Sequence, residues 1–340
     1  MTTATEALHI ADIARLAGVS IGTVSRALNN QGRIAPATRE RILRIVEETG
    51  YVRNASALSL VGRRTGIVEV VVTAVIDEYV GGVILGVNQA LGPAGYSMLL
   101  RIGVPGEEWE HYYAGHLSRR TSDGALLIVP KYVDDGELAR RYERGYPLVV
   151  VDNRGGDLTV PSVGVSHYEG ARQAAEHLLT LGHMRVAIIT GALSEHSGRQ
   201  RLRGYRDALA EAGAPPPDDA IVAGDYSPRS GAEAMRALLR RPARPSAVCA
   251  SNDHMARAAL DVIRDAGLSV PRDISLVGFD DFPFAAVTTP PLTTVRQPLE
   301  SIGRVAATML RDLIDGRALA EPCVRLPTSL VVRSTTGPAQ

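Results

Sequence analysis

The chain has 340 residues, enough for two or three domains with a well-buried core, and its 37 basic and 37 acidic residues leave no net charge. Two cysteines in so long a chain argue against a disulfide framework and indicate a reducing compartment. The first residues show no signal-peptide pattern, and no window approaches the roughly 18 uncharged apolar residues of a membrane span, so we expect a cytoplasmic protein with no membrane partner.

Charge is distributed unevenly along the chain. Residues 1–64 hold nine arginines and five acids, whereas the remainder holds 28 basic and 32 acidic residues. This asymmetry favours an anionic partner for the N-terminal segment alone.

The N-terminal segment predicts three helices. A run with apolar residues at helical spacing ends at Gly18, and Ser20 can cap a second helix that reaches about Leu28. A third helix begins at about Pro36 and stops at Gly50. Two short helices joined by a tight turn and followed by a third form a helix-turn-helix. An ordinary helical hairpin is the alternative.

The second of these helices carries the polar side chains of the motif. Ser20, Thr23 and Ser25 supply hydroxyl groups, and Arg26 can reach a phosphate or a guanine edge. A helix-turn-helix presents its second helix to the major groove of DNA. The segment therefore predicts a DNA-binding headpiece.

The pattern changes after a short polar connector at residues 51–64. From Gly66 onward, short apolar runs such as VEVVV, GALLIVP, RVAIIT and ISLVG alternate with helical stretches. Buried strands between helices predict parallel sheets with helices on both faces. Because nine or more such strands are too many for one sheet, we expect an α/β fold with two doubly wound lobes.

Several longer motifs occur in order along the chain. They are IADIARLAGVSIGTVSRALNN, TRERILRIVEETGY, NASALSL, HLLTLGHMRVAIITG, RLRGYRDAL, ASNDHMA, DISLVGFDD and PPLTTVRQP. Over roughly residues 9–335 the chain thereby resembles the lac/galactose repressor family of bacterial regulators. The resemblance implies an all-α helix-turn-helix headpiece, a hinge helix, and a two-lobed effector domain of the periplasmic-binding-protein type.

The resemblance also implies domain boundaries. The headpiece is expected at 1–50, the hinge helix and linker at 51–64, and the effector-binding and dimerisation domain at 65–335. Within that domain the N-lobe comprises about 65–165 and 299–325, and the C-lobe about 166–298 and 326–335.

Carried over by position, the family's DNA-contacting residues fall on the second helix, on the segment after the third, and on the hinge. They are Ile21, Gly22, Thr23, Ser25, Arg26 and Asn29, then Tyr51 and Asn54, then Ala57 and Leu60. As an apolar wedge, Leu60 can part a base step from the minor groove and kink the duplex. Packing of Leu60 against the body is the alternative.

The chain departs from the family where relatives read bases. Two specificity positions are Ile21 and Gly22, of which Ile21 can offer only apolar contact and Gly22 has no side chain. Arg53 stands where proline is usual, and Leu58 where the hinge often has arginine. The operator sequence therefore cannot be inferred from relatives.

Polar residues follow the predicted strands of the two lobes. Asp152, Asn252 and Asp280 end strands, Arg201 begins a helix after another, and Tyr226 follows a fifth. In open parallel sheets ligands bind beyond the carboxyl ends of the strands, so these side chains can converge on a polyhydroxylated molecule. The alternatives are helix capping for the aspartates, a solvated face for Arg201 and a structural role for Tyr226.

In the resembling family these positions contact the effector, which is a sugar, a sugar derivative or, in a few cases, a nucleobase or nucleoside. His254, two residues after Asn252, is a further candidate. The loop after the first strand departs from the family, since Asp77 and Tyr79 take the places of an asparagine and an aromatic residue and Ala74 replaces an acid. We therefore expect an effector unusual for the family.

No catalytic or metal site is predicted. His111 with His116 and His177 with His183 lack the spacing of a helical metal pair, and no Ser/His/Asp constellation or phosphate-loop motif can be placed on the sequence. A soluble α/β enzyme and a sugar-transport protein are the competing hypotheses. We expect instead a cofactor-free transcriptional repressor, a homodimer on palindromic double-stranded DNA, whose affinity for DNA an effector alters.

Overall fold

The computed structural model divides into two compact units, Met1–Thr65 and Gly66–Gln340. The described residues are 8–28, 32–51, 64–72, 77–103, 121–128, 135–152 and 159–340. No helix among them has the length and apolarity needed to cross a membrane.

The first unit contains the three predicted helices, α1 (Ile10–Leu16), α2 (Ile21–Leu28) and α3 (Pro36–Thr49). Gly18, at φ +59°, makes the turn between α1 and α2, and Gly50, at φ +62°, ends α3. Both positions are left-handed, which glycine adopts without a steric penalty. The helices bury a small common core: Ile13, Ala14, Ala17, Val24, Ala27 and Ile42.

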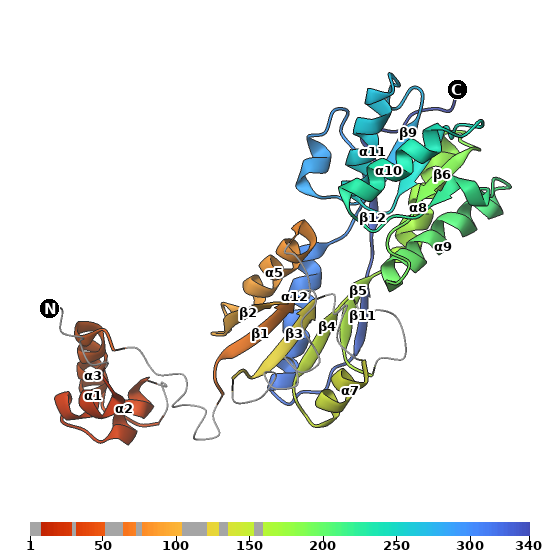
Figure 1. Cartoon of the computed structure of the whole chain (residues 1–340). Helices are drawn as coiled ribbons and strands as arrows, with labels where there is room; N and C mark the ends of the chain where they lie inside the picture. The colour runs from red at the N-terminus through yellow and green to blue at the C-terminus, as the bar shows by residue number, and fades with distance from the viewer. Residues whose placement is uncertain are drawn as a thin grey trace. The chain divides into compact units, whose positions relative to one another are not determined.

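The second unit contains two six-stranded sheets among the described residues, which we call the N-lobe and C-lobe sheets (Figure 1). The N-lobe sheet has the order β11 (Cys323–Leu326), β5 (Ser162–Val165), β4 (Leu148–Val151), β3 (Gly124–Ile128), β1 (Ile67–Val72), β2 (Ser97–Ile102). The C-lobe sheet has the order β12 (Ser329–Val331), β10 (Thr293–Arg296), β9 (Ser275–Asp280), β8 (Ala247–Ala250), β6 (Val186–Ile189), β7 (Ile221–Val222).

Helices cover both faces of each sheet. In the N-lobe, α5 (Glu78–Leu91) and α12 (Leu299–Ile314) pack on one face, and α7 (Asp135–Glu143) packs on the other. In the C-lobe, α8 (His167–Thr180) and α9 (His196–Glu211) cover one face, and α10 (Pro228–Leu239) and α11 (Asp253–Asp265) cover the other. The predicted two-lobed α/β class is confirmed.

The pairing is parallel throughout except between β10 and β12, which are antiparallel. The chain passes between the lobes three times, from β5 to α8, from β10 to α12 and from β11 to β12 (Figure 1). The last three strands were not among the predicted apolar runs, because β10 reads TTVR and β11 reads CVRL, each with a polar or charged residue in a four-residue strand.

Candidate functional site

The second helix of the headpiece exposes its N-terminal end. Ser20 Oγ accepts a hydrogen bond from the backbone N–H of Thr23 at 3.2 Å and lies 2.9 Å from its hydroxyl. This bond satisfies one of the free N–H groups of the first turn of α2, as the predicted cap requires. Ile21 is 51% exposed, and Gly22 beside it is exposed too.

Arg26 lies along its own helix in this structure. Its Nε donates to the carbonyl oxygen of Gly22 at 3.1 Å, and its Nη2 donates to Thr23 Oγ1 at 3.4 Å. Ser25 is half-buried, and the side chain of Tyr51 packs against the headpiece core. The predicted contacts Asn29, Asn54, Ala57 and Leu60 lie outside the described residues.

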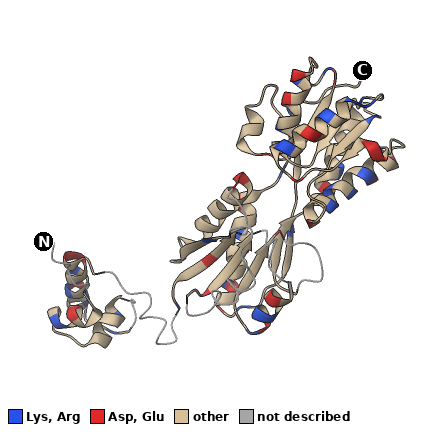
Figure 2. Cartoon of the chain, viewed as in Figure 1, with Lys and Arg blue, Asp and Glu red and all other residues tan. Residues whose placement is uncertain are grey.

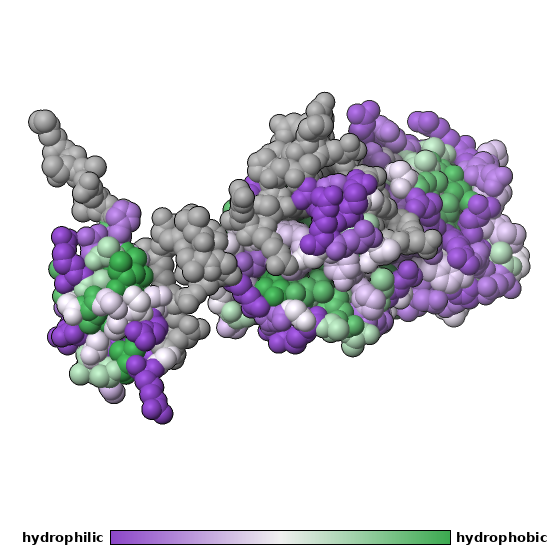
Figure 3. Space-filling view, turned by 90° about the horizontal axis from the view of Figure 1, so that it is seen from below, coloured by the Kyte–Doolittle hydropathy of each residue, from purple (hydrophilic) through white to green (hydrophobic). Residues whose placement is uncertain are grey.

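The surface of the headpiece combines arginines with apolar side chains (Figures 2 and 3). Exposed residues of these two kinds are Arg15, Arg26, Arg33, Arg41, Arg44, Leu16, Ile21 and Leu43. Guanidinium groups suit phosphates, and apolar side chains suit thymine methyls. The surface can therefore meet both the backbone and the bases of a duplex.

One pocket in the second unit is lined by all eight predicted effector residues. Its cavity volume is about 140 Å³, room for on the order of ten water molecules. The predicted lining residues are Asp77, Tyr79, Asp152, Arg201, Tyr226, Asn252, His254 and Asp280. Both lobes contribute, because α5 and β4 belong to the N-lobe and the remaining elements belong to the C-lobe.

The ends of strands and the starts of helices place these side chains. Asp152 directly follows β4, and Asp280 is the last residue of β9. Asn252 caps α11, with its Oδ1 accepting from Met255 N at 2.9 Å. The prediction that Arg201 begins a helix is wrong. The loop after β6 ends at Glu195 and His196 starts α9, so Arg201 lies in the second turn of that helix.

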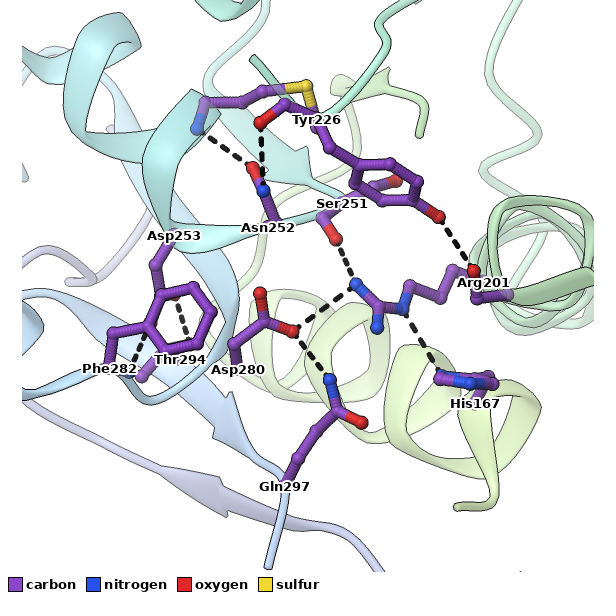
Figure 4. Close-up of polar contacts among 12 residues, drawn as sticks. His167, Arg201, Tyr226, Ser251, Asn252, Asp253, Asp280, Phe282, Thr294 and Gln297 are labelled. Atoms are coloured by element: carbon purple, nitrogen blue, oxygen red, sulfur yellow. Dashed lines mark hydrogen bonds and ion pairs between the residues drawn. The ribbon is translucent and has the colours of Figure 1, made fainter. Parts of the chain in front are cut away.

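Arg201 is the centre of the polar network in the pocket (Figure 4). The residue is 4% exposed, and its Nη1 donates to the Ser251 carbonyl oxygen and lies 3.4 Å from Asp280 Oδ1. The Phe279 ring stacks on the guanidinium with its centroid 3.8 Å away. A buried guanidinium is stable only where such partners replace water.

His167 connects Arg201 to Asp152. Arg201 Nε donates to His167 Nδ1 at 3.4 Å, and His167 Nε2 lies 3.0 Å from Asp152 Oδ1. Because Nδ1 accepts, the imidazole is neutral and its proton resides on Nε2, which donates to Asp152. Burial lowers the pKa of His167 against the opposing effect of Asp152. The pKa of Asp152 lies below its usual range, because His167 and Arg201 outweigh the effect of its burial.

Asp280 is held by Gln297 as well as by Arg201. Gln297 Nε2 donates to Asp280 Oδ1 at 2.6 Å, and the Gln297 Oε1 atom is buried without a hydrogen-bond partner among the described residues. Burial raises the pKa of Asp280 to about 7, although Arg201 and Gln297 act in the opposite direction. A carboxyl group that titrates near neutrality can both donate and accept hydrogen bonds.

Tyr226 reaches into the pocket from the loop after β7. Its hydroxyl lies 3.0 Å from Ser197 Oγ, and its carbonyl oxygen accepts from Asn252 Nδ2 at 3.0 Å. A Cβ atom at Gly191 would overlap the tyrosine ring, so the glycine provides the space. Tyr226 therefore owes its position to its neighbours rather than to its own strand.

The backbone is strained at the pocket. Among the described residues, the non-glycine residues with positive φ are Asp152 (55°), Tyr226 (71°), Asp280 (119°) and Asp281 (58°). Three of the four line the pocket. Strained residues of this kind persist where surrounding contacts determine them, and they concentrate at ligand sites.

A second link between the lobes lies at the pocket wall. His254 Nε2, from α11, is 3.1 Å from Glu78 Oε2, at the start of α5. The His254 ring lies 5.2 Å from the Phe282 ring and 5.1 Å from the Phe284 ring. This wall is therefore aromatic, with one polar bridge from lobe to lobe.

Five lining residues were not predicted: Val80, Glu195, Ser197, Phe282 and Gln297. They lie one to six residues from a predicted position or on a crossing between lobes, so a search of the flanking loops could have found most of them. His167 was also missed, because its neighbours Ser166 and Tyr168 make it look like an ordinary start of a helix.

Two further histidines of the C-lobe, His177 and His183, have structural partners. His183 Nδ1 lies 3.0 Å from Ser246 Oγ, and His183 Nε2 lies 3.0 Å from both Ser275 Oγ and the Gly337 carbonyl. His177 Nε2 contacts Thr336 Oγ1 at 2.9 Å. The described part of the chain contains no group of three histidine, cysteine or acidic residues arranged to hold a metal ion.

Comparison with known proteins gives concordant matches. A sequence model described as bacterial regulatory proteins, lacI family, matches residues 9–54, and one described as a periplasmic binding protein-like domain matches residues 175–336. The HTH-type transcriptional regulator CelR of Thermobifida fusca is 38% identical over 335 residues, which are 95% of this chain and 96% of that protein.

Solved structures agree over nearly the whole chain. A complex of the transcriptional regulator CelR with cellobiose has a TM-score of 0.73 at 36% identity and covers 96% of this chain and 99% of that one. The lac repressor dimer bound to operator and the anti-inducer ONPF has a TM-score of 0.86 at 29% identity and covers 98% and 100%.

Proposed function

Because this chain belongs to the lacI family of bacterial regulatory proteins, we propose that it is a transcriptional repressor which an effector in the interlobe pocket releases from DNA. The predicted family and the prediction of a regulator rather than an enzyme are confirmed by the relatives. One observation carries the proposal: side chains from both lobes converge on one pocket in a chain that also has a helix-turn-helix.

In the headpiece, α2 is the helix that we expect to contact DNA. The exposed Ser20 and Ile21 and the half-buried Thr23 lie at the end of the helix that enters the major groove in this motif. Binding to DNA requires Arg26 to exchange its bonds to Gly22 and Thr23 for a phosphate or a base edge. Because Gly22 has no side chain, we expect the protein to discriminate weakly between bases at the operator position that Gly22 faces.

In the hinge, we propose that Asn54 contacts the DNA backbone and that Ala57 and Leu60 enter the minor groove of the operator. We expect Leu60→Ala to weaken operator binding at least tenfold and to leave effector binding unchanged, because the apolar wedge acts only on DNA. Gel shift and calorimetric titration measure the two affinities. Equal loss of both would assign Leu60 to packing instead.

A homodimer is part of the proposal. Strand β2 is at the edge of the N-lobe sheet in the described residues, and three of its apolar side chains are exposed, Leu99, Leu100 and Ile102. An unpaired edge strand with apolar side chains is a surface that proteins normally cover. A symmetric pair of chains would cover it and align two headpieces with a palindromic operator.

We expect the effector to bind in the pocket between the two lobes. A sugar or a related polar molecule would accept hydrogen bonds from Arg201 and donate hydrogen bonds to Asp152 and Asp280, while its apolar ring face packs on Tyr226 or Phe282. A ligand held by both lobes favours the arrangement in which they are close. That difference in affinity between two arrangements is what shifts DNA binding.

The test is a gel-shift series with DNA from the chain's own promoter region. We expect retardation that weakens steeply as salt rises, because each phosphate contact releases a counterion. Asp280→Ala should still retard the same DNA but no longer release it on addition of effector. Failure to retard any upstream fragment at low salt would rule out the repressor.

A further inference from the structure

Among the described residues, the pocket is lined by more carboxyl groups than positively charged side chains. In the part of the chain that the structure describes, the carboxyl groups of Asp77, Asp152, Glu195 and Asp280 line it together with the guanidinium of Arg201. Asp152 remains ionised at neutral pH, because its pKa is lowered. An anionic ligand entering this pocket would meet like charges in a partly desolvated space.

The guanidinium of Arg201 is already engaged by the protein. Its Nε donates to His167, and its Nη1 faces the Ser251 carbonyl oxygen and Asp280. A bidentate grip on a carboxylate needs two adjacent N–H donors of the fork, Nε with Nη2 or Nη1 with Nη2. Either pair includes a nitrogen that already has a partner, and only Nη2 makes no hydrogen bond to the described residues.

We propose that this pocket selects an uncharged polyhydroxylated ligand, a neutral sugar, and rejects sugar acids and sugar phosphates. His167 is a specificity-determining residue in this scheme, because it accepts from Arg201 Nε. Only Nη2 of the guanidinium is then left without a hydrogen bond to the described residues. The inference rests on the proposed function, since it names the chemical class of the effector of the same pocket.

A neutral sugar matches the groups that remain. Gln297 Oε1 is a buried acceptor without a partner among the described residues, and the Oδ1 of Asp280 already accepts from Gln297 Nε2. A hydroxyl group can donate to Gln297 Oε1 or to the second oxygen of Asp280 and accept from Arg201 Nη2. Asn252 adds little, because its amide is bound to Met255 N and to the Tyr226 carbonyl.

The test compares matched ligands on the full-length protein. Thermal shift and titration calorimetry are run with glucose and glucuronate, galactose and galacturonate, and cellobiose and its uronic acid derivative. We expect the stabilising sugars to be neutral, each with a Kd at least tenfold lower than that of its acid. An acid that binds as tightly as its neutral partner would overturn the inference and leave the proposed sugar effector standing. If no sugar of either kind binds, the proposed effector class itself fails, and the inference fails with it.

Variants test the cause of the selection. Asp77→Asn removes a wall charge and keeps a residue that can cap α5, where Asp77 now accepts from Val80 N at 3.0 Å. We expect it to narrow the discrimination against the acid several-fold. Glu233→Gln, which makes the same charge change on the exposed face of α10 outside the pocket, should leave the discrimination unchanged.

His167→Gln and His167→Phe test the role of the histidine. Glutamine can still accept from Arg201 and donate to Asp152, so we expect it to retain the preference for neutral sugar, whereas phenylalanine frees Arg201 Nε and should relax it. A merely structural role predicts equal affinity losses for neutral and acidic ligands in both variants, which would contradict the assignment.

Discussion

At the scale of single residues, Tyr226 shows how a pocket side chain depends on small neighbours. Gly191 lies against its ring, and Gly198 lies near its hydroxyl. We predict that Gly191→Ala displaces the ring, destabilises the fold by about 1–3 kcal/mol and weakens effector binding roughly tenfold. Gly164→Ala in β5, where an added Cβ meets nothing within 4 Å, is the control. Urea unfolding measures the stability and calorimetry measures the effector affinity. Equal stabilities and equal affinities for the two variants would contradict this account.

Asp280 supports a prediction about pH. Its pKa is raised to about 7 from the ordinary 3.8, so between these values the folded protein holds a proton that the unfolded chain has lost. The free energy of unfolding therefore falls as pH rises through this window, by up to about 1.4 kcal/mol per pH unit, and levels off above pH 7. We expect Asp280→Asn, which keeps an acceptor for Gln297, to lack this slope. Urea unfolding at pH 5, 6, 7 and 8 gives the difference, and parallel curves would contradict the assignment.

The pocket residues could be predicted from sequence where topology alone decides. Asp152, Asn252 and Asp280 lie at the end of a strand or just after it, and the carboxyl ends of parallel strands meet at one edge of a sheet. His167 could not be predicted in this way, because its role depends on a ring orientation shared with two side chains from different lobes. Gln297 was missed because it follows strand β10, whose sequence TTVR is too polar for the apolar pattern to reveal.

At the scale of elements, α5 and α12 pack backbone against backbone in the N-lobe. A Cβ at Gly86 would overlap the Glu300 backbone, and one at Gly303 would overlap the Val83 carbonyl oxygen. We predict that Gly86→Ala destabilises the protein by about 3 kcal/mol, since backbone atoms cannot rotate away. Gly81→Ala, in the same helix with open space around it, should instead stabilise it by about 0.5–1 kcal/mol. Denaturant unfolding gives both changes. Midpoints that move in the same direction for Gly86→Ala and Gly81→Ala would contradict the close packing of α5 on α12.

Element boundaries followed from local chemistry where glycine, proline or an apolar run marked them. Gly18, Pro36 and Gly50 delimit the headpiece helices as predicted. Arg201 was misplaced by more than a turn, because nothing between the strand and the arginine marks where the loop ends and α9 begins. Strand β12 reads SLV, too short for periodicity to reveal.

At the scale of the whole molecule, the proposed switch depends on two links between the lobes besides the chain crossings. One is the His167–Asp152 bond in the pocket, and the other is the His254–Glu78 pair at its wall. A ligand that strengthens both favours closed lobes, and in a dimer that change is transmitted to both headpieces at once. We therefore propose the dimer as the unit whose DNA affinity the effector controls.

The dimer surface leads to the last prediction. Leu100 in β2 is 37% exposed at the edge of the N-lobe sheet, beside the equally exposed Leu99. We predict that Leu100→Asp converts the protein to monomers at micromolar concentration, because a buried carboxylate without a partner opposes association. Operator affinity should fall more than tenfold, because two linked headpieces bind far more tightly than one.

Sedimentation velocity and gel shift measure the two effects. Met184→Asp places the same charge on an apolar residue that is 56% exposed in the C-lobe, away from β2, and it should stay dimeric with normal operator affinity. Effector binding should survive in both variants, because the pocket lies within a single chain. A Leu100→Asp protein that remains dimeric would move the interface away from β2, whereas a monomer with full operator affinity would show that one headpiece suffices.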